Sequence, residues 1–194
     1  MRLLGFISSL LPTLFWGLII FGFEEPYMAI MTIICALIHE GGHLLFTEAK
    51  GPIRGVVSGF RIRTGGIVSY RQRILTYLGG PMANLLVCLF CLPATVMGNE
   101  YIGVFSLINL VTALSNLMPI EGYDGYGILM TLIEMRELDG RFHSALIWLS
   151  NSIIMVLTVF SLCLIDRVGG GYWIFAVFFS YLVKVVDRGL FKEF

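Results

Sequence analysis

Residues 28–43 read MAIMTIICALIHEGGH, and this stretch decides how the rest of the chain is interpreted. The part that ends at Ile38 is almost wholly apolar, as expected of a helix inside a membrane. His39 and His43 are four positions apart, so on a helix both imidazoles lie on one face and can bind one metal ion. Glu40 lies about 100° round the same helix and can reach a water molecule bound to that ion.

These polar residues would be costly without a function. A carboxylate and two imidazoles in hydrocarbon cost several kcal/mol unless they are paired or bound to a metal. The chain has three histidines, and two of them fall in this stretch. A chance polar cluster at a membrane surface would more often contain lysine or arginine, whose long side chains reach water. We therefore interpret the motif as a metal site, with a chance match as the alternative.

The composition is that of an integral membrane protein. The chain has 194 residues, of which 57% are hydrophobic, and its mean hydropathy is +0.86. Only 13% of the residues are charged, against about 25% in soluble proteins. The net charge is zero, which gives no electrostatic basis for binding nucleic acid. We expect one polytopic domain over residues 1–194.

Six segments are long and apolar enough for the roughly 20 residues that a spanning helix needs. They cover about residues 3–23, 27–47, 74–97, 101–118, 143–165 and 172–186. The expected fold is therefore an all-α membrane protein with about six transmembrane helices. The first apolar run is too long for the hydrophobic part of a secretion signal, so we count it as a span.

The charges between the segments predict the orientation. Six basic residues and no acidic residue lie in the stretch 50–73, which the positive-inside rule places in the cytoplasm. They are Lys50, Arg54, Arg61, Arg63, Arg71 and Arg73. With six spans, the N- and C-termini are then also cytoplasmic, and so is the half of the second helix that carries the histidines.

The same basic loop contains a β-hairpin pattern. The sequences FRIR at 60–63 and IVSY at 67–70 alternate, and TGG at 64–66 provides glycines for a turn between them. Strand edges cannot face lipid unpaired, so such a hairpin would be membrane-associated, at the interface or against protein. Its edge could bind an extended peptide as an added strand. A basic surface hairpin without a substrate role is the alternative.

Small residues begin the third segment, where residues 78–84 read LGGPMAN. Such residues allow helices to approach closely within a bilayer. Asn84 brings a polar amide to this depth and needs a partner, which could be the second helix or a bound group. Cys88 and Cys91 have the spacing of a metal or redox pair, but a lone pair in a membrane helix is better explained as small buried residues.

The fourth segment ends in NLMPIEGYDG, residues 116–125. Pro119 cannot continue the helix with its hydrogen bonds intact, so the chain turns near the depth of the histidines. A catalytic zinc usually has three protein ligands and an open position for water. Asp124, in this turn, is the expected third ligand, and Glu121 is the rival carboxylate.

Three separated motifs are the basis of a family resemblance: HEGGH (39–43), GPMAN (80–84) and NxxPxxxxDG (116–125). Together they resemble the site-2 protease family of intramembrane zinc metalloproteases, and most closely its compact sporulation-protease subgroup. The resemblance covers about residues 27–130, which would be the catalytic core. The chain departs from the family's usual pattern at Gly122, where proline is common, and at Tyr126, where a second glycine is common.

The resemblance implies a role for each motif residue. The implied zinc ligands are His39, His43 and Asp124. Glu40 would be the general base, and Asn116 would polarise the scissile carbonyl or hold the oxyanion. Asn84 would support the site or the substrate.

The implied activity is regulated intramembrane proteolysis, in which a zinc metalloendopeptidase hydrolyses peptide bonds in or next to transmembrane segments. The expected protein is multi-pass, in a bacterial cell membrane, with a membrane-associated protein substrate, the lipid bilayer and a regulatory membrane protein as partners. One alternative is an inactive protein of the same fold that binds membrane helices and keeps a structural metal. A small transporter is a third reading, but the sequence has no convincing internal repeat.

Overall fold

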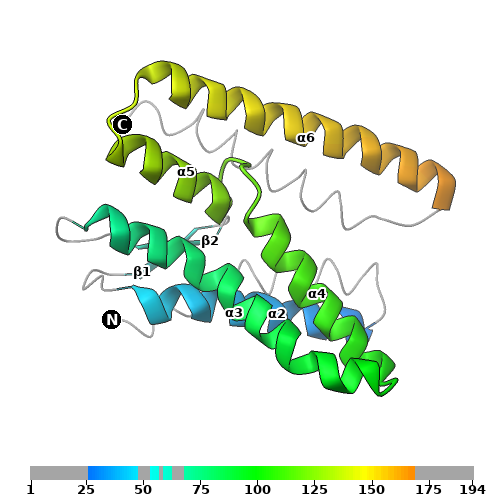
Figure 1. The fold of residues 1–194 in the computed structure, drawn as a ribbon. Helices are drawn as coiled ribbons and strands as arrows, with labels where there is room; N and C mark the ends of the chain where they lie inside the picture. The colour runs from blue at the N-terminus through cyan, green and yellow to red at the C-terminus, as the bar shows by residue number, and fades with distance from the viewer. Residues whose placement is uncertain (1–25, 48–52, 57–58, 63–67, 169–194) are drawn as a thin grey trace.

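A computed structural model describes residues 26–47, 53–56, 59–62 and 68–168, which form five helices and one small sheet (Figure 1). The helices are α2 (Pro26–Phe46), α3 (Tyr70–Val96), α4 (Glu100–Asn116), α5 (Asp124–Met135) and α6 (Gly140–Val168). The predicted first and sixth spans, 3–23 and 172–186, lie outside the described residues.

Among the described residues, three helices are long and apolar enough to cross a membrane, which indicates a membrane protein of the helical class. They are α2, α3 and the part Gly140–Phe160 of α6. The segment predicted as the fourth span forms α4, whose 17 residues fall short of the roughly 20 that a spanning helix needs. The total of six spans therefore stays a prediction.

The helices bury small and polar side chains and expose large apolar ones. Ala29, Ala113 and Asn84 are 0% exposed, whereas Phe90 and Val96 on α3 are 83% and 85% exposed. A soluble protein has the reverse distribution. Helices in a bilayer pack through small residues and turn their large apolar side chains to lipid, so the burial pattern agrees with the hydropathy.

The packing places α2 against α3 more closely than ordinary side chains allow. Helices α2, α3 and α4 pack on one another, α5 packs on α3, and α6 contacts α5 (Figure 1). Where α2 meets α3, the backbone carbonyl of Gly42 occupies the position of a Cβ on Gly79, and the carbonyl of Gly79 that of a Cβ on Gly42. Only a pair of residues without side chains permits this approach, and it fixes the HEGGH turn against α3.

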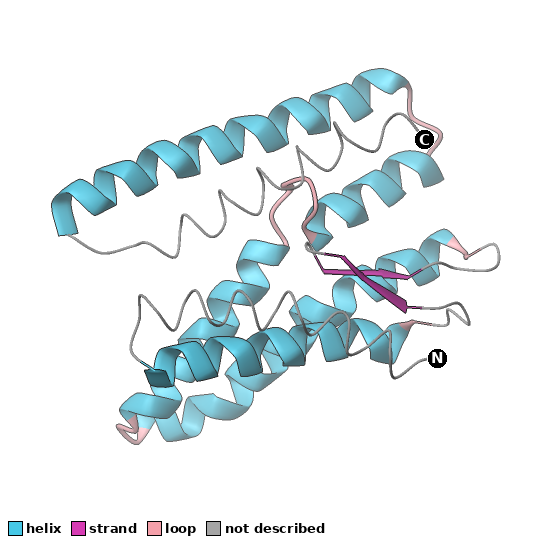
Figure 2. Ribbon diagram, turned by 180° about the vertical axis from the view of Figure 1, so that it is seen from behind, coloured by secondary structure: helices cyan, strands magenta, loops and turns pink. Residues whose placement is uncertain are grey.

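The segment between α2 and α3 contains an antiparallel strand pair, seen in Figure 2. Strand β1 (Ile53–Val56) pairs with β2 (Gly59–Ile62), and Gly55 lies opposite Phe60. The predicted pairing of 60–63 with 67–70 is not confirmed, since the partner strand that the structure describes for 59–62 precedes residue 60 in the chain.

The end of the predicted hairpin begins a helix instead. Val68 and Ser69 lie outside any strand, and Tyr70 is the first residue of α3. The hydroxyl of Ser69 accepts a hydrogen bond from the backbone nitrogen of Gln72 at 3.2 Å. This N-cap satisfies a backbone donor of the first turn, and so favours helix over strand at this point.

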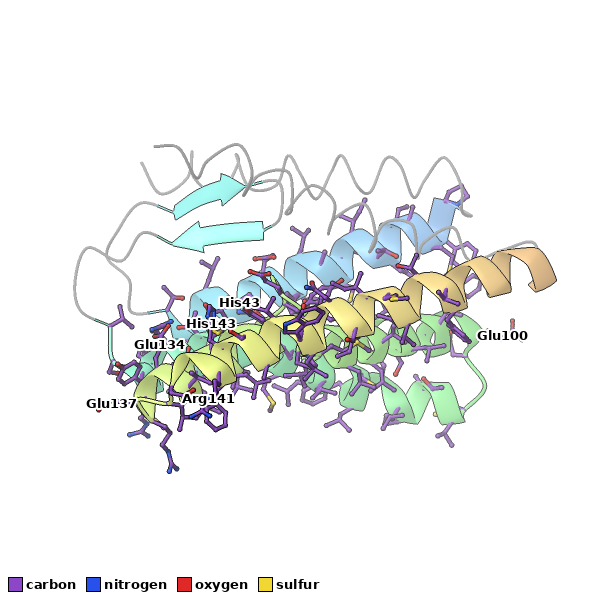
Figure 3. All side chains as sticks on the ribbon, turned by 90° about the horizontal axis from the view of Figure 1, so that it is seen from above. His43, Glu100, Glu134, Glu137, Arg141 and His143 are labelled. Carbon is purple, nitrogen blue, oxygen red and sulfur yellow. The ribbon has the colours of Figure 1, made fainter. Side chains whose placement is uncertain are left out.

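Charged and titratable side chains gather toward one end of the helices. Figure 3 shows His43, Glu134, Glu137, Arg141 and His143 in this half and Glu100 at the opposite end. An ion pair between Arg73 Nη1 and Glu134 Oε2, at 2.5 Å, joins α3 to α5. The histidines of α2 therefore lie toward the more polar end of the described helices.

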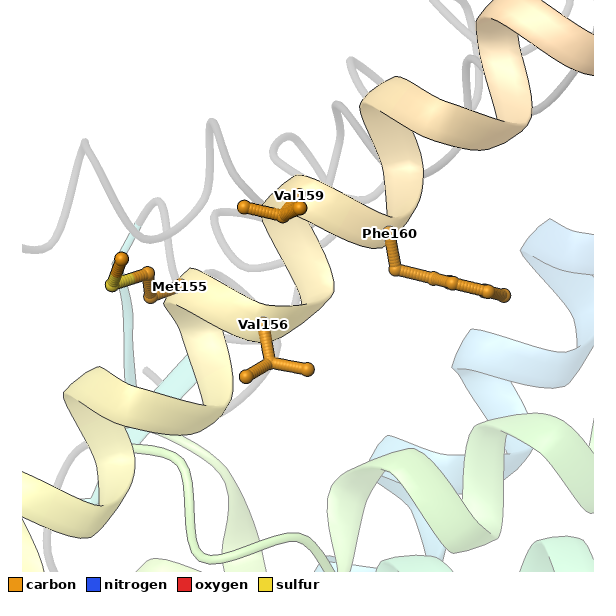
Figure 4. Close-up of a pocket in the computed structure, with 4 residues that line it drawn as sticks. All are labelled: Met155, Val156, Val159 and Phe160. Atoms are coloured by element: carbon orange, nitrogen blue, oxygen red, sulfur yellow. The ribbon is translucent and has the colours of Figure 1, made fainter.

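One face of α6 forms an open apolar hollow, shown in Figure 4. Its four lining residues are 53% to 70% exposed. They are Met155, Val156, Val159 and Phe160. A face of this kind fits contact with lipid tails or with another membrane helix.

Candidate metal centre

Two helices bring three metal-binding side chains together. Nε2 of His39 lies 3.2 Å from Nε2 of His43, and both belong to α2. Oδ2 of Asp124, the first residue of α5, lies 3.1 Å from Nε2 of His39 and 3.4 Å from Nε2 of His43. His39 and Asp124 are 7% and 9% exposed. The three residues predicted as ligands thus form a largely buried group that can hold a metal ion.

The spacing of the three atoms fits a tetrahedral ion. Ligand atoms about 2.0–2.1 Å from zinc in a tetrahedral arrangement are separated by about 3.3 Å. The observed separations of 3.1, 3.2 and 3.4 Å bracket this value. A central ion can therefore be accommodated without moving the helices.

Hydrogen bonds fix which nitrogen of each histidine carries the proton. Nδ1 of His39 lies 2.8 Å from Oδ1 of Asn84, and Nδ1 of His43 lies 2.7 Å from the backbone oxygen of Thr76. Both partners are acceptors, so both Nδ1 atoms are donors. In a neutral imidazole the other nitrogen then carries a lone pair. Metal-binding histidines typically show this arrangement, with the second nitrogen donating to an oxygen.

Three lone-pair atoms consequently face one another. The Nε2 atoms of His39 and His43 point at Oδ2 of Asp124, which is buried and has no hydrogen-bond donor among the described residues. Protonating Nε2 of one imidazole would provide a hydrogen bond between only two of the three atoms. A cation between the three atoms satisfies all of them, and this is the observation that fits the group to a metal.

The aspartate supplies the negative charge of the group. Burial raises the pKa of the Asp124 carboxyl, and hydrogen bonds and charges from His39 and His43, which apply when an imidazole is protonated at Nε2, lower this pKa below its usual value. A carboxylate has to be deprotonated to bind a metal ion, and a lowered pKa favours that form.

A glycine on α3 makes room for the rings. A Cβ on Gly80 would lie 2.5 Å from Nε2 of His43 and 2.7 Å from Cε1 of His39. Real Cβ atoms do not approach other atoms so closely, so the second half of the LGGPMAN stretch is shaped to the two imidazoles. The small residues predicted as packing residues also form one wall of the metal centre.

The chain reaches Asp124 through a short connection after α4. Gly122 has a φ of +95°, a left-handed conformation that glycine adopts easily and that proline cannot adopt. The backbone nitrogen of Tyr123 donates to the oxygen of Ile120 at 2.9 Å. The prediction that Asp124 lies within the turn is corrected, because this residue begins α5.

This connection is also bound to α6. The hydroxyl of Ser150 accepts a hydrogen bond from the backbone nitrogen of Glu121 at 2.8 Å, and Ser150 is 1% exposed. Glu121, the rival carboxylate, is outside the three-residue group that can hold a metal. The backbone of the segment that leads to Asp124 is thus tied to α6.

Glu40 interacts electrostatically with the group, whereas the described hydrogen bond of Asn116 stays within α4. Glu40 interacts electrostatically with His43, His39 and Asp124, in that order of strength. The amide nitrogen of Asn116 donates to the backbone oxygen of Thr112 at 2.9 Å, one turn back in α4. This local bond does not test the predicted role of Asn116 toward a substrate.

Asn84 has a definite place in the site. Its side chain is 0% exposed, its Oδ1 accepts from His39, and its Nδ2 donates to the backbone oxygen of Cys35 and to Oδ1 of Asn109. Of the two partners considered from the sequence, the second helix is therefore the one the structure shows. Asn109 and Ser150 were not predicted, because a single polar residue in an apolar helix has no periodic pattern.

Taken together, fold and site define a helical membrane protein with a largely buried group of two histidines and one aspartate that could hold a metal ion. Comparison with known protein families gives no match for this chain, and no curated protein is detectably similar to it.

Proposed function

We propose that the protein is an intramembrane zinc metalloprotease of the site-2 type, which hydrolyses peptide bonds in or next to transmembrane segments. The observation that supports this most is the convergence of three lone-pair atoms at tetrahedral spacing next to a carboxylate outside the group, Glu40. Two imidazoles and one carboxylate leave one position of a tetrahedral shell for water, as in catalytic zinc sites.

The proposed ligands are His39, His43 and Asp124. Zinc bound there would act as a Lewis acid, making the attacking water more acidic and polarising the scissile carbonyl. Glu40 would accept a proton from that water and pass it to the leaving amine as the C–N bond breaks. The amide of Asn116 would donate to the carbonyl oxygen as negative charge develops on it.

The proposed substrate is a membrane-associated protein. A transmembrane helix hides its carbonyls in hydrogen bonds, so a substrate segment has to unwind before its carbonyl carbon is open to attack by the water molecule that Glu40 would deprotonate. We further propose six spans with both termini in the cytoplasm, an orientation that the basic stretch 50–73 supports. The strand pair after α2 would be membrane-associated. A separate membrane protein would regulate the activity.

The test is a comparison of membranes that contain wild-type protein or the Glu40→Gln variant. Glutamine keeps the shape of the side chain but cannot accept the proton, so metal content should be unchanged and cleavage lost. Proteins that persist uncut only with the variant are the candidate substrates. Glu121→Gln makes the same change in a carboxylate that is neither a proposed ligand nor the proposed base, and this variant should behave like wild type.

Two results would contradict the proposal. Equal cleavage by wild type and Glu40→Gln would refute the base assignment. A wild-type protein that binds metal but cleaves nothing, with the metal shell closed by a fourth protein ligand, would support the inactive protein with a structural metal.

A further inference from the structure

A stripe of polar residues runs along α4 and contacts both neighbouring helices. Ser106 and Asn109 are 4% and 0% exposed, although most of the helix is apolar. The hydroxyl of Ser106 donates to the backbone oxygen of Cys88 on α3 at 3.2 Å. Thr112 accepts from the thiol of Cys35 on α2 at 3.2 Å. Each contact joins helices. Asn109 bonds directly to Asn84, the partner of His39, whereas Thr112 reaches Asn84 through Sγ of Cys35.

The orientation of the Asn109 amide is determined by its surroundings. Nδ2 of Asn109 donates to the backbone oxygen of Phe105 at 2.9 Å, which only an NH₂ group can do. Oδ1 of Asn109 must then point the other way, and it accepts from Nδ2 of Asn84 at 2.8 Å. The backbone oxygen of Phe105 therefore determines which atom donates in each hydrogen bond between Asn109, Asn84 and His39.

Asn84 transmits this orientation. One N–H of its amide is used by Asn109 and the other by the backbone oxygen of Cys35 at 3.1 Å. Both donors are occupied, so Oδ1 of Asn84 is left facing Nδ1 of His39 at 2.8 Å. An acceptor at this place requires the proton on Nδ1 and a lone pair on Nε2, which is the form that binds a cation.

We propose that Asn109 is a positioning residue for the metal centre, acting through Asn84 to fix the tautomer and ring orientation of His39. The proposal rests on the metal site of the proposed function, and it assigns to α4 a role in metal binding that none of its side chains performs directly. A metal-binding histidine typically donates a hydrogen bond from its second nitrogen to a partner residue. Removing that partner typically changes metal affinity about 10–100-fold.

The experiment uses the full-length protein in lipid nanodiscs with zinc and cobalt(II) as probes. Asn109→Leu keeps the branched shape of the side chain but removes the acceptor, and should weaken zinc about 10-fold and shift the visible absorption of bound cobalt. Asn109→Asp, protonated at this buried position, retains both a donor and an acceptor and should restore both properties. Ser106→Ala removes a bond of the same kind farther along α4 and should change neither.

A measurement on the wild-type protein keeps the proposal testable if Asn109→Leu does not fold. Nitrogen-15 NMR of the metal-free protein should show His39 protonated at Nδ1. A proton on Nε2 instead would overturn the proposal, as would an Asn109→Leu variant with wild-type zinc affinity and cobalt spectrum. If wild type binds neither metal, the proposed function fails as well. If wild type binds metal and Asn109→Leu is indistinguishable from Ser106→Ala, only the positioning role fails.

Discussion

Gly80 lies so close to His43 that a methyl group on its Cα would be 2.5 Å from Nε2 of the imidazole. Gly80→Ala should therefore push the rings apart, lower stability by about 1–3 kcal/mol and weaken zinc binding. Thermal unfolding and zinc titration of the purified protein measure the two effects. Gly41→Ala is the control, because a Cβ on Gly41 meets nothing within 4 Å. Equal zinc affinity in the two variants would contradict the proposed wall.

Replacing Asp124 by asparagine should remove the negative charge from the centre while keeping its shape. Loss of a direct ligand should weaken zinc by more than the roughly 10–100-fold of an outer partner. The Glu121→Gln variant carries the same change of charge three residues away, and isothermal titration should find its affinity close to wild type. A stronger effect at Glu121 than at Asp124 would make Glu121 the ligand.

Removing the metal should destabilise the protein. The metal-free centre holds two nitrogens and a carboxylate oxygen that face one another. At a free zinc concentration 100 times the Kd, binding adds about 2.7 kcal/mol, which raises Tm by about 5–10 °C. Chelation should lower Tm by this amount, and added zinc should restore it.

The same centre should lose zinc in acid. A histidine must be neutral to bind a metal ion, so zinc affinity should fall as the pH is lowered into the acid range. A His39→Ala variant should show no response to chelator, and a wild-type Tm that does not respond either would argue against a metal centre.

Ser150→Ala should loosen the segment that leads to Asp124. The variant leaves the backbone nitrogen of Glu121 without its acceptor on α6, at a cost of about 1 kcal/mol. Hydrogen exchange at this amide should become faster. Thr158→Ala removes a bond that stays within α6, from Thr158 to Ile154, and should leave exchange at Glu121 unchanged. Equal exchange in both variants would mean that α6 does not restrain the segment.

The sequence carried enough information to predict the donor residues. The four-residue spacing of His39 and His43 places both rings on one helix face, and this follows from helix geometry alone. Asp124 could be predicted because Pro119 ends a helix at the right depth. The structure brings these three residues together.

Other features depended on contacts that local patterns do not report. Gly125 and Gly127 weaken the helix propensity of residues 124–135, so α5 was not predicted. In the structure the carbonyl of Leu117 lies where a Cβ on Gly125 would be, and the ring of Tyr77 lies where one on Gly127 would be. The same glycines that obscure the helix are therefore the ones that let it pack.

The hairpin register and Asn109 could not be predicted for the same reason. The helix cap at Ser69 competes with the strand pattern around it, and a single residue decides the outcome. Asn109 binds Asn84 on a different helix, 25 positions earlier in the chain. Gly122 explains the departure from the family's proline, since its φ of +95° excludes one.

The donors come from α2 and from the first residue of α5, with two whole helices made between them. During synthesis, α2 therefore enters the membrane carrying Glu40 and two imidazoles long before the ribosome has produced their aspartate. An unfinished copy lacks a third donor. Under the proposed function, an incompletely synthesised protease is therefore inactive, because the order of translation delays completion of the metal site until Asp124 has been made.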